Sequence, residues 1–437
     1  MLFTSKYFSR SFSTALSLST ALAFSVALGC IAITSQASDH LDVEAITALT
    51  LETALSLAMR HNPDIAVAER EREAIEGTKT QAGIRPNPSI STSIQDTSSD
   101  TRQIYLQLNQ EIELGNKREA RIEAADAVYK KSTAELDSKK AEIHANVVNA
   151  FYEVLAAQER LKLSQSSFEI ASQALDAAAK RVKAGKSSPV EETKSKIAQS
   201  SAKIELNQAT SQLSSARKRL TALWGSANPA FERAQGNVEN IPTIASLNDL
   251  TTSLESAPAI SMAKLEINAR DGITKVEQSK ATPNITLSAG VVNNQELGGR
   301  NQALLGLSVP IPIFDRNQGH LQEAISRQYK AQDALIALKA QLEANLAFQY
   351  ERLNAARQTS ASIRNEILPG AQSAFDAATK GFQAGKFDFL DVLDAQRTLF
   401  QAKSQYIQAL LDAHQAVAEI ERILGDVVTH STHQPQE

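Results

Sequence analysis

Residues 116–183 form a stretch of 68 residues that contains neither proline nor glycine. A continuous helix of this length would extend about 100 Å, because each helical residue adds about 1.5 Å. No single globular core can enclose such a helix, so the fold must be built around long helices. Residues 322–368 are a second stretch without either residue, and they predict another long helix.

Large side chains recur at every seventh position of these helices, and small side chains recur three residues after them. The large positions of the first stretch are Val147, Val154, Leu161, Phe168, Leu175 and Val182. The small positions are Ala150, Ala157, Ser164, Ala171 and Ala178. The same spacing relates Leu368, Phe375, Phe382 and Phe389. This pattern is typical of coiled coils whose helices approach closely. A plain dimeric coiled coil would explain the heptads alone.

Four other segments alternate between apolar and polar side chains, which predicts β-strands. Residues 103–114 alternate over twelve positions, and residues 89–94 precede them across a polar loop. In the second half of the chain, residues 285–291 and 303–313 alternate on either side of another polar loop. Membrane-crossing strands need about 9–11 residues with one apolar face. A half-buried sheet in a soluble domain has the same pattern, but the long helices favour the membrane interpretation.

The chain also repeats itself once, with offsets of 195 to 200 residues between matching landmarks. The tripeptide Ala184-Gly185-Lys186 recurs as Ala384-Gly385-Lys386, and the segment that starts at Pro88 recurs from Pro283. The strand around Leu106 and Leu108 recurs around Leu305 and Leu307. Because the landmarks keep the same order, each half is predicted to be one structural unit, related to the other by a pseudo-twofold axis.

The repeat predicts the domain boundaries. The first unit is expected at 38–240, with a β-hairpin at about 88–114 and a long helical hairpin at about 116–224. The second unit is expected at 241–425, with a β-hairpin at about 283–313 and a long helical hairpin at about 316–425. Short helices should precede each β-hairpin, and the polar residues 426–437 are expected to be a disordered tail.

The first 37 residues have the features of an export signal. Lys6 and Arg10 form a basic start, an apolar run follows, and Ser35-Gln36-Ala37 is a small-x-small cleavage site before Ser38. Two alternatives are a transmembrane anchor and a lipoprotein signal that modifies Cys30, the single cysteine of the chain. No later apolar run reaches the length of about 18 residues that a transmembrane helix needs.

Four strands from one chain cannot close a barrel, and an open sheet edge cannot lie in lipid. The strands are therefore expected to close by assembly. Three copies would supply twelve strands around an open lumen, although closure alone also allows two or four copies. The predicted fold is mainly α, a long coiled-coil barrel of helices, with a membrane β-barrel portion of four strands per protomer. The net charge of −4 gives no indication of a nucleic-acid partner.

Two strand-to-helix junctions resemble those of the TolC-like outer-membrane efflux protein family. The first comprises Pro86-Asn87-Pro88 and the run Glu113-Leu114-Gly115-Asn116-Lys117-Arg118, followed by Arg121. The second is the run from Val309 to Gly319, whose sequence is VPIPIFDRNQG. These junctions resemble most closely the branch of the family that exports heavy-metal cations. Pro310 and Pro312 should loosen strand pairing, and Asp315 and Asn317 could cap the following helix.

The resemblance implies a passive duct, with no enzymatic activity and no cofactor. It implies a homotrimer with a β-barrel in outer-membrane lipid and a helical barrel through the periplasm. It also implies two protein partners, a periplasmic adaptor (membrane fusion protein) and an inner-membrane RND pump. The substrate is expected to be heavy-metal cations, with drugs or other organic solutes as the alternative.

The resemblance also assigns the candidate site residues. In the family, acidic side chains ring the narrow periplasmic end, and the matching residues here are Asp391 and Asp394 on one helix face. Without the family, two solvated helix acids would be the simpler interpretation. The hairpin tips that would dock the adaptor are Ala184, Gly185, Lys186, Ala384, Gly385 and Lys386. His430 and His433 in the polar tail could bind metal weakly, or the tail could be plainly disordered. No catalytic triad, phosphate-binding loop or metal-ligand cluster is recognisable in the sequence.

Overall fold

The computed structural model describes residues 46–384, 386–387 and 389–425. Several expectations concern other residues. The signal peptide, the start at Ser38, the possible modification of Cys30, the tail with His430 and His433, and Gly385 at one tip all lie outside the described residues.

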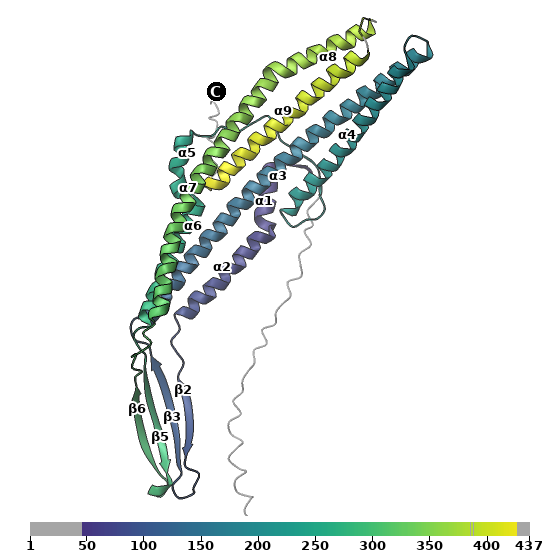
Figure 1. The fold of residues 1–437 in the computed structure, drawn as a ribbon. Helices are drawn as coiled ribbons and strands as arrows, with labels where there is room; N and C mark the ends of the chain where they lie inside the picture. The colour runs from purple at the N-terminus through teal and green to yellow at the C-terminus, as the bar shows by residue number, and fades with distance from the viewer. Residues whose placement is uncertain (1–45, 385, 388, 426–437) are drawn as a thin grey trace, which may run out of the picture. The chain divides into compact units, whose positions relative to one another are not determined.

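Long helices dominate the described chain (Figure 1). The first half contains α1 (Leu51–His61), α2 (Pro63–Ala82), α3 (Lys117–Lys183) and α4 (Pro189–Ala222). The second half contains α5 (Leu247–Ser253), the short η1 (Leu254–Ser256), α6 (Pro258–Ser279), α7 (Gln318–Ser362), the π-turn η3 (Ile363–Ile367), α8 (Leu368–Gln383) and α9 (Phe389–Leu424). The predicted long helix α3 is confirmed as one uninterrupted element of 67 residues.

The second long helix crosses a proline without ending. Helix α7 passes through the π-turn Ile363–Ile367 directly into α8, and Pro369 occupies the first turn of α8. A proline ring normally clashes with the carbonyl four residues earlier. The wider π-turn lies where that clash would occur, so the chain keeps a helical course across Pro369.

The predicted strands form one antiparallel sheet with the order β2-β3-β5-β6 (Figure 1). Its members are β2 (Ser89–Gln95), β3 (Gln103–Ile112), β5 (Ile285–Asn294) and β6 (Arg300–Ser308). The central pair, β3 and β5, joins the two halves of the chain. A small parallel pair, β1 (Ile46–Leu49) and β4 (Phe231–Ala234), was not predicted from the sequence.

The register of the sheet separates an apolar face from a polar face. Ile90, Leu108, Ala289 and Leu305 lie side by side across the four strands, and Leu106 lies opposite Val291. On the other face, Ser89, Asn109, Ser288 and Gly306 form a row in which Ser288 Oγ donates to Asn109 Oδ1. The large apolar side chains are exposed, reaching 84% for Leu305. The alternation predicted from the sequence is thus confirmed, and the apolar face of the sheet is exposed.

Two expectations about the strand ends are wrong. The alternating pattern predicted strands to Leu114 and Ile313, but β3 ends at Ile112 and β6 ends at Ser308. Pro310 explains the early end of β6, because it has no N–H to offer the ladder.

The predicted cap of the following helix is also wrong. Asn317 occupies the N-cap position of α7 in the left-handed conformation, with φ of 60°, and its side chain makes no capping bond. Its amide instead donates to the backbone oxygen of Glu277 at 2.8 Å and to the Glu277 carboxylate at 2.7 Å. The residue therefore ties α7 to the end of α6, and Asp315 Oδ1 accepts from the Asn317 N–H at 2.9 Å.

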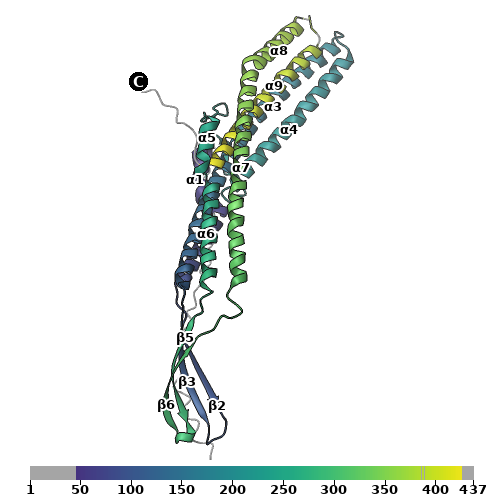
Figure 2. The same cartoon turned by 60° about the vertical axis from the view of Figure 1, so that its left-hand side comes forward.

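Two of the large heptad positions of α3 are buried in the protein core, and the four later ones, from Leu161 to Val182, are half-buried. Val147 and Val154 are fully buried, and they pack with Phe151, Leu213 and Leu220 in the core of the first half. A second core, built around Leu346, Leu353 and Ile420, lies in the second half. Helix α3 contacts α4, α6 and α9, and Figures 1 and 2 show it between α4 and α9. The predicted seam is therefore confirmed as a packing surface within the core of the first half. Other residues of α3, namely Tyr152, Ala156 and Leu163, contact Ile407 and Leu411 of α9 and so join the two halves.

Candidate functional site

The first candidate tip is a tight turn between α3 and α4. Gly185 adopts φ of +68°, which a residue with a side chain rarely does. The Lys186 N–H donates to the Arg181 oxygen at 2.9 Å and the Gly185 N–H donates to the Val182 oxygen at 3.0 Å, which closes the helix end. Helix α4 then starts with the Ser188 hydroxyl accepting from the Val190 N–H. Ala184, Gly185 and Lys186 are exposed, so this tip is free to contact another molecule.

The second candidate tip, between α8 and α9, is also closed by backbone hydrogen bonds at the end of a helix. The Ala384 N–H donates to the Lys380 oxygen at 3.0 Å, and the Lys386 N–H donates to the Gly381 oxygen at 2.9 Å. The Phe387 ring lies against Gly381 so closely that a β-carbon at Gly381 would overlap the ring. Ala384 and Lys386 are exposed. Five of the six predicted tip residues are thus described, and all five lie at exposed helix ends.

The two hairpins are held together just below their tips. The Arg181 guanidinium of α3 lies over the Phe382 ring of α8, 4.7 Å from its centre. Ala174 of α3 packs on a small cluster that includes Ala378 and Val392. Further along, the Gln396 side chain donates to the Ser167 oxygen at 3.4 Å. These contacts place both tips at the same end of the helical part of the chain.

Asp391 and Asp394 lie in the first turns of α9, and both side chains are exposed. Their neighbours Val392 and Gln396 are buried against the other helices, so the two carboxylates occupy the opposite face of α9. The predicted i, i+3 placement on one face is therefore observed. The corresponding acids of the first hairpin, Glu191 and Glu192, are half-buried, and Glu191 accepts a hydrogen bond from the Ser187 hydroxyl. An open acidic face is thus a feature of the second hairpin.

The junction residues that carried the resemblance form a structural joint. Arg121 donates two hydrogen bonds to the Glu113 carboxylate, one of them at 3.0 Å. Arg118 donates to the Gly83 oxygen at 2.7 Å, which ties the end of α2 to the start of α3. Gly115 has φ of +72°, and a β-carbon there would lie 2.7 Å from Thr282. The motif therefore fixes the angle at which strand β3 turns into helix α3.

A buried polar cluster between α3 and α9 was not predicted. The His414 ring stacks on Tyr152 with centres 3.5 Å apart, and His414 Nε2 lies 2.8 Å from the Val238 oxygen. Burial lowers the pKa of His414 to about 4 and raises the pKa of nearby Glu421 to about 7. The partners come from three distant parts of the chain, so no local pattern in the sequence could indicate the cluster.

The buried carboxyl of Glu421 predicts a pH-dependent stability. Between pH 4.5 and about 7 the folded protein keeps a proton on Glu421 that the unfolded chain releases, so the contribution of Glu421 to stability falls as the pH rises through this window, whereas the contribution of His414 has the opposite sign. We expect Glu421→Gln to abolish this loss and to stabilise the protein at pH 8 by at most about 3 kcal/mol per protomer. At pH 4.5 the variant and the parent should be nearly equal.

Thermal unfolding at pH 4.5 and pH 8 checks this expectation. Glu419→Gln on the same helix is the matched control, because Glu419 is paired with Arg422, the two atoms Oε2 and Nε lying 2.9 Å apart. The control should give no gain at pH 8. Equal unfolding temperatures of Glu421→Gln and the parent at pH 8 would show that burial does not raise the pKa of the Glu421 carboxyl.

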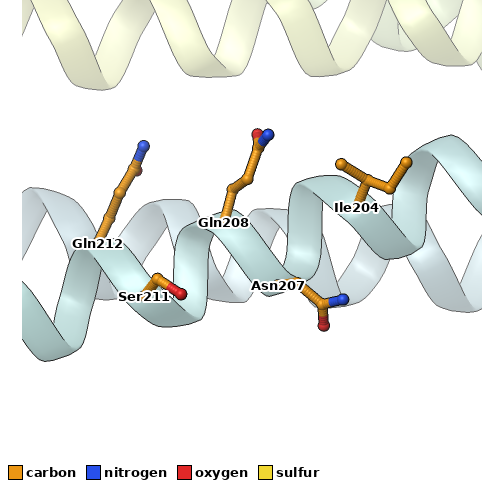
Figure 3. A pocket seen from close by; sticks show the side chains of 5 residues that line it. All are labelled: Ile204, Asn207, Gln208, Ser211 and Gln212. Carbon is orange, nitrogen blue, oxygen red and sulfur yellow. The ribbon is translucent and has the colours of Figure 1, made fainter.

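A shallow hollow lies on the surface of α4 (Figure 3). It has a volume of about 420 Å³ and is lined by Ile204, Asn207, Gln208, Ser211 and Gln212. All five residues come from one helix, and none of them titrates near neutral pH. The hollow therefore has the character of an unfilled helix face, and it lacks the converging polar groups of a substrate pocket.

The described part of the chain has neither an apolar helix of membrane-spanning length nor a cluster of metal-binding side chains. No helix there is long and apolar enough to cross a membrane. Within the same residues, no group of three or more His, Cys, Asp or Glu side chains is placed to hold a metal ion.

Comparison with known proteins gives consistent matches. The sequence profile of a family described as "Outer membrane efflux protein" matches residues 54–226 and again residues 250–426. The chain is 43% identical over 382 residues to the cobalt-zinc-cadmium resistance protein CzcC of Cupriavidus metallidurans, covering 87% of this chain and 91% of CzcC. It is 30% identical over 307 residues to the nickel and cobalt resistance protein CnrC of the same organism, covering 68% and 71% of the two chains.

The fold is also shared with a solved structure. The outer membrane protein VceC of Vibrio cholerae superposes with a TM-score of 0.72, covering 86% of this chain and 96% of VceC. The two sequences are 20% identical, so this likeness concerns the fold.

Proposed function

Because the chain belongs to the outer membrane efflux protein family, we propose that three copies form the exit duct of a tripartite pump that exports heavy-metal cations. The chain is an efflux channel component of the outer membrane, with a periplasmic extension, and the family is one of transport proteins rather than enzymes. The trimer, the barrel, the protein partners and the substrate are proposals.

The observation that carries the proposal is the open four-stranded sheet. Among the described residues, strands β2 and β6 each have a neighbour on one side alone, and the apolar face of the sheet is exposed. A free edge cannot remain unpaired in lipid, so β6 of one copy would pair with β2 of the next. Three copies would make twelve strands, with the apolar face towards lipid and the polar face towards the lumen.

An exposed stripe on α4 supports assembly of the helical part. Val190, Ile197 and Ile204 recur every seven residues and are 59%, 62% and 58% exposed. On α7, Tyr329 and Ile336 are exposed with the same spacing. Heptad-spaced apolar residues on unfilled helix faces are the usual surface of a coiled-coil contact. We assign these two stripes to the contact between neighbouring copies, which would also fill the hollow on α4.

The repeat supports a barrel built from two similar units per copy. Each half has two short helices, a β-hairpin and a long helical hairpin in the same order. We therefore propose that residues 38–240 and residues 241–425 are the two structural units, related by a pseudo-twofold axis. Residues 1–37 are the proposed signal peptide, and residues 426–437 are the proposed tail.

The end of the protein that carries the two hairpin tips has two proposed roles. The tips at 184–186 and 384–386 would dock a periplasmic adaptor, which connects the duct to an inner-membrane RND pump. Asp391 and Asp394 would line the aperture at this end, where three copies place six carboxylates. A ring of carboxylates attracts cations and repels anions, which suits a metal-cation substrate.

The substrate can be tested by deletion. A strain without this chain should become sensitive to cobalt, zinc and cadmium, the metals in the name of its 43% identical relative. Growth is measured across graded concentrations of these metals, of nickel and copper, and of organic drugs, with and without a plasmid copy of the gene. Restored metal tolerance supports the proposal. Sensitivity to drugs alone would assign organic substrates instead.

A further inference from the structure

The apolar face of strand β6 continues beyond the end of the strand. Leu305 and Leu307 belong to this face inside β6. Val309, Ile311 and Ile313 keep the same alternation through the following connector, and all are exposed. Ile311 is 79% exposed and the adjacent Phe314 is 90% exposed, as much as the residues of the sheet itself. Figure 2 shows the connector between β6 and α7 as an irregular segment.

The backbone of this connector has few free donors. Pro310 and Pro312 have no N–H group, and the Ile313 N–H donates to the Ile311 oxygen at 3.0 Å. Three of the five positions from 309 to 313 therefore present no unpaired amide. An unpaired N–H in hydrocarbon costs several kcal/mol, whereas in water it costs almost nothing. The exposed side chains of the connector thus suit an apolar environment, whereas its carbonyl groups still need hydrogen-bond partners, which lipid headgroups and interfacial water supply.

The equivalent connector of the first half is different. Between β3 and α3 it carries Glu113, Leu114, Gly115 and Asn116; Glu113 is paired with Arg121, and Leu114, 38% exposed, is its one large apolar residue. An apolar connector is therefore no general requirement for joining a strand to a helix in this protein. It occurs on the side of β6, which is an edge strand.

A neighbouring copy offers little apolar surface to cover the connector. In the proposed ring, β6 adjoins β2 of the next copy, and β2 is preceded by Arg85, Pro86, Asn87 and Pro88. Ile84 is the one large apolar side chain in the five residues before β2. This segment could cover one of the four exposed side chains of the connector, which leaves the others without a protein contact.

We propose that the apolar side chains of residues 309–314 insert among the lipid acyl chains of the periplasmic leaflet while their backbone lies at the headgroup level, which extends the membrane contact of the sheet below its last hydrogen bond. The proposal rests on the proposed barrel. Asp315 and Arg316, both exposed, mark the return to water directly after Phe314. An aromatic residue at this boundary is usual in membrane proteins, because the ring is favoured at the headgroup level.

Spin labelling tests this placement in the full-length chain reconstituted in phosphatidylcholine–phosphatidylglycerol vesicles. The variants Ile311→Cys and Ile313→Cys report on the connector, Leu305→Cys on the sheet face, and Arg316→Cys on the water boundary. Each label is measured for collision with oxygen, which concentrates in the bilayer, and with a nickel chelate, which stays in water. The unsubstituted chain, carried through the same labelling, measures any signal from Cys30.

We expect the oxygen-to-nickel ratio at Ile311 and Ile313 to match that at Leu305 and to exceed that at Arg316 several-fold. A high nickel collision rate at both connector positions would place them in water and overturn the proposal. Low collision rates with both reagents would show that protein covers the connector, which overturns it equally. If Leu305 itself collides with nickel, the proposed barrel fails, and this result is distinct from failure of the connector alone.

Discussion

The double variant Asp391→Asn/Asp394→Asn is expected to lose most of the cation preference of the channel. Both carboxylates are exposed on one face of α9, and three copies would bring six charges to a single constriction. Low-dielectric walls focus the field of such a ring on the ions that pass. Asparagine keeps the size of the side chain, so the variant removes charge without changing shape. The reversal potential across a planar bilayer under a salt gradient measures the change.

The effect should depend on salt and on position. Because the Debye length shrinks from about 30 Å at 0.01 M to about 10 Å at 0.1 M, the loss should be larger at low ionic strength. The matched control is Glu191→Gln/Glu192→Gln, which removes the same number of charges from the half-buried acids of the first hairpin. An unchanged reversal potential in the Asp391/Asp394 variant would assign these residues to a solvated helix face away from the pore.

Val154→Asp is expected to remove most of the protein from the outer membrane. Val154 is fully buried in the seam of α3, where its neighbours are apolar side chains from both hairpin helices. A carboxylate without a partner at such a site costs several kcal/mol per copy, which is a large part of the stability of a typical domain. Immunoblotting of fractionated membranes measures the surviving amount.

Val67→Asp is the matched control for this substitution. Val67 lies on α2 and is 68% exposed, so the same change there should leave the amount of protein near that of the parent. Comparable amounts of the Val154→Asp variant and the parent would show that the seam does not form the core of the assembled protein.

The long helices and the sheet could be predicted because their signals are local. The absence of proline and glycine from residues 116–183 is a direct property of the segment that became α3. The period-two alternation likewise identified both faces of the sheet. The β1–β4 pair could not be predicted, because each strand has four residues and its partner lies far along the chain.

Some helix caps and strand ends could not be predicted from the sequence, because they depend on contacts with distant elements or on the end of the hydrogen-bonded ladder. Asn317 was expected to cap its own helix, but its amide reaches Glu277, 40 residues earlier. The strand pattern was extended to Ile313, because side-chain alternation continues after the hydrogen-bonded ladder has ended at Ser308. The turn at Gly185 was predicted correctly, because a glycine that ends a helix is a local requirement. The stack of His414 on Tyr152 had no such local signal.

In the proposed assembly, a single chain supplies one third of a closed duct. Native mass spectrometry of the protein released from outer membranes in mild detergent tests it most directly. We expect a dominant species with the mass of three chains, which dissociates to single chains on heat denaturation. A dominant monomer, or a closed assembly of two or four chains, would contradict it.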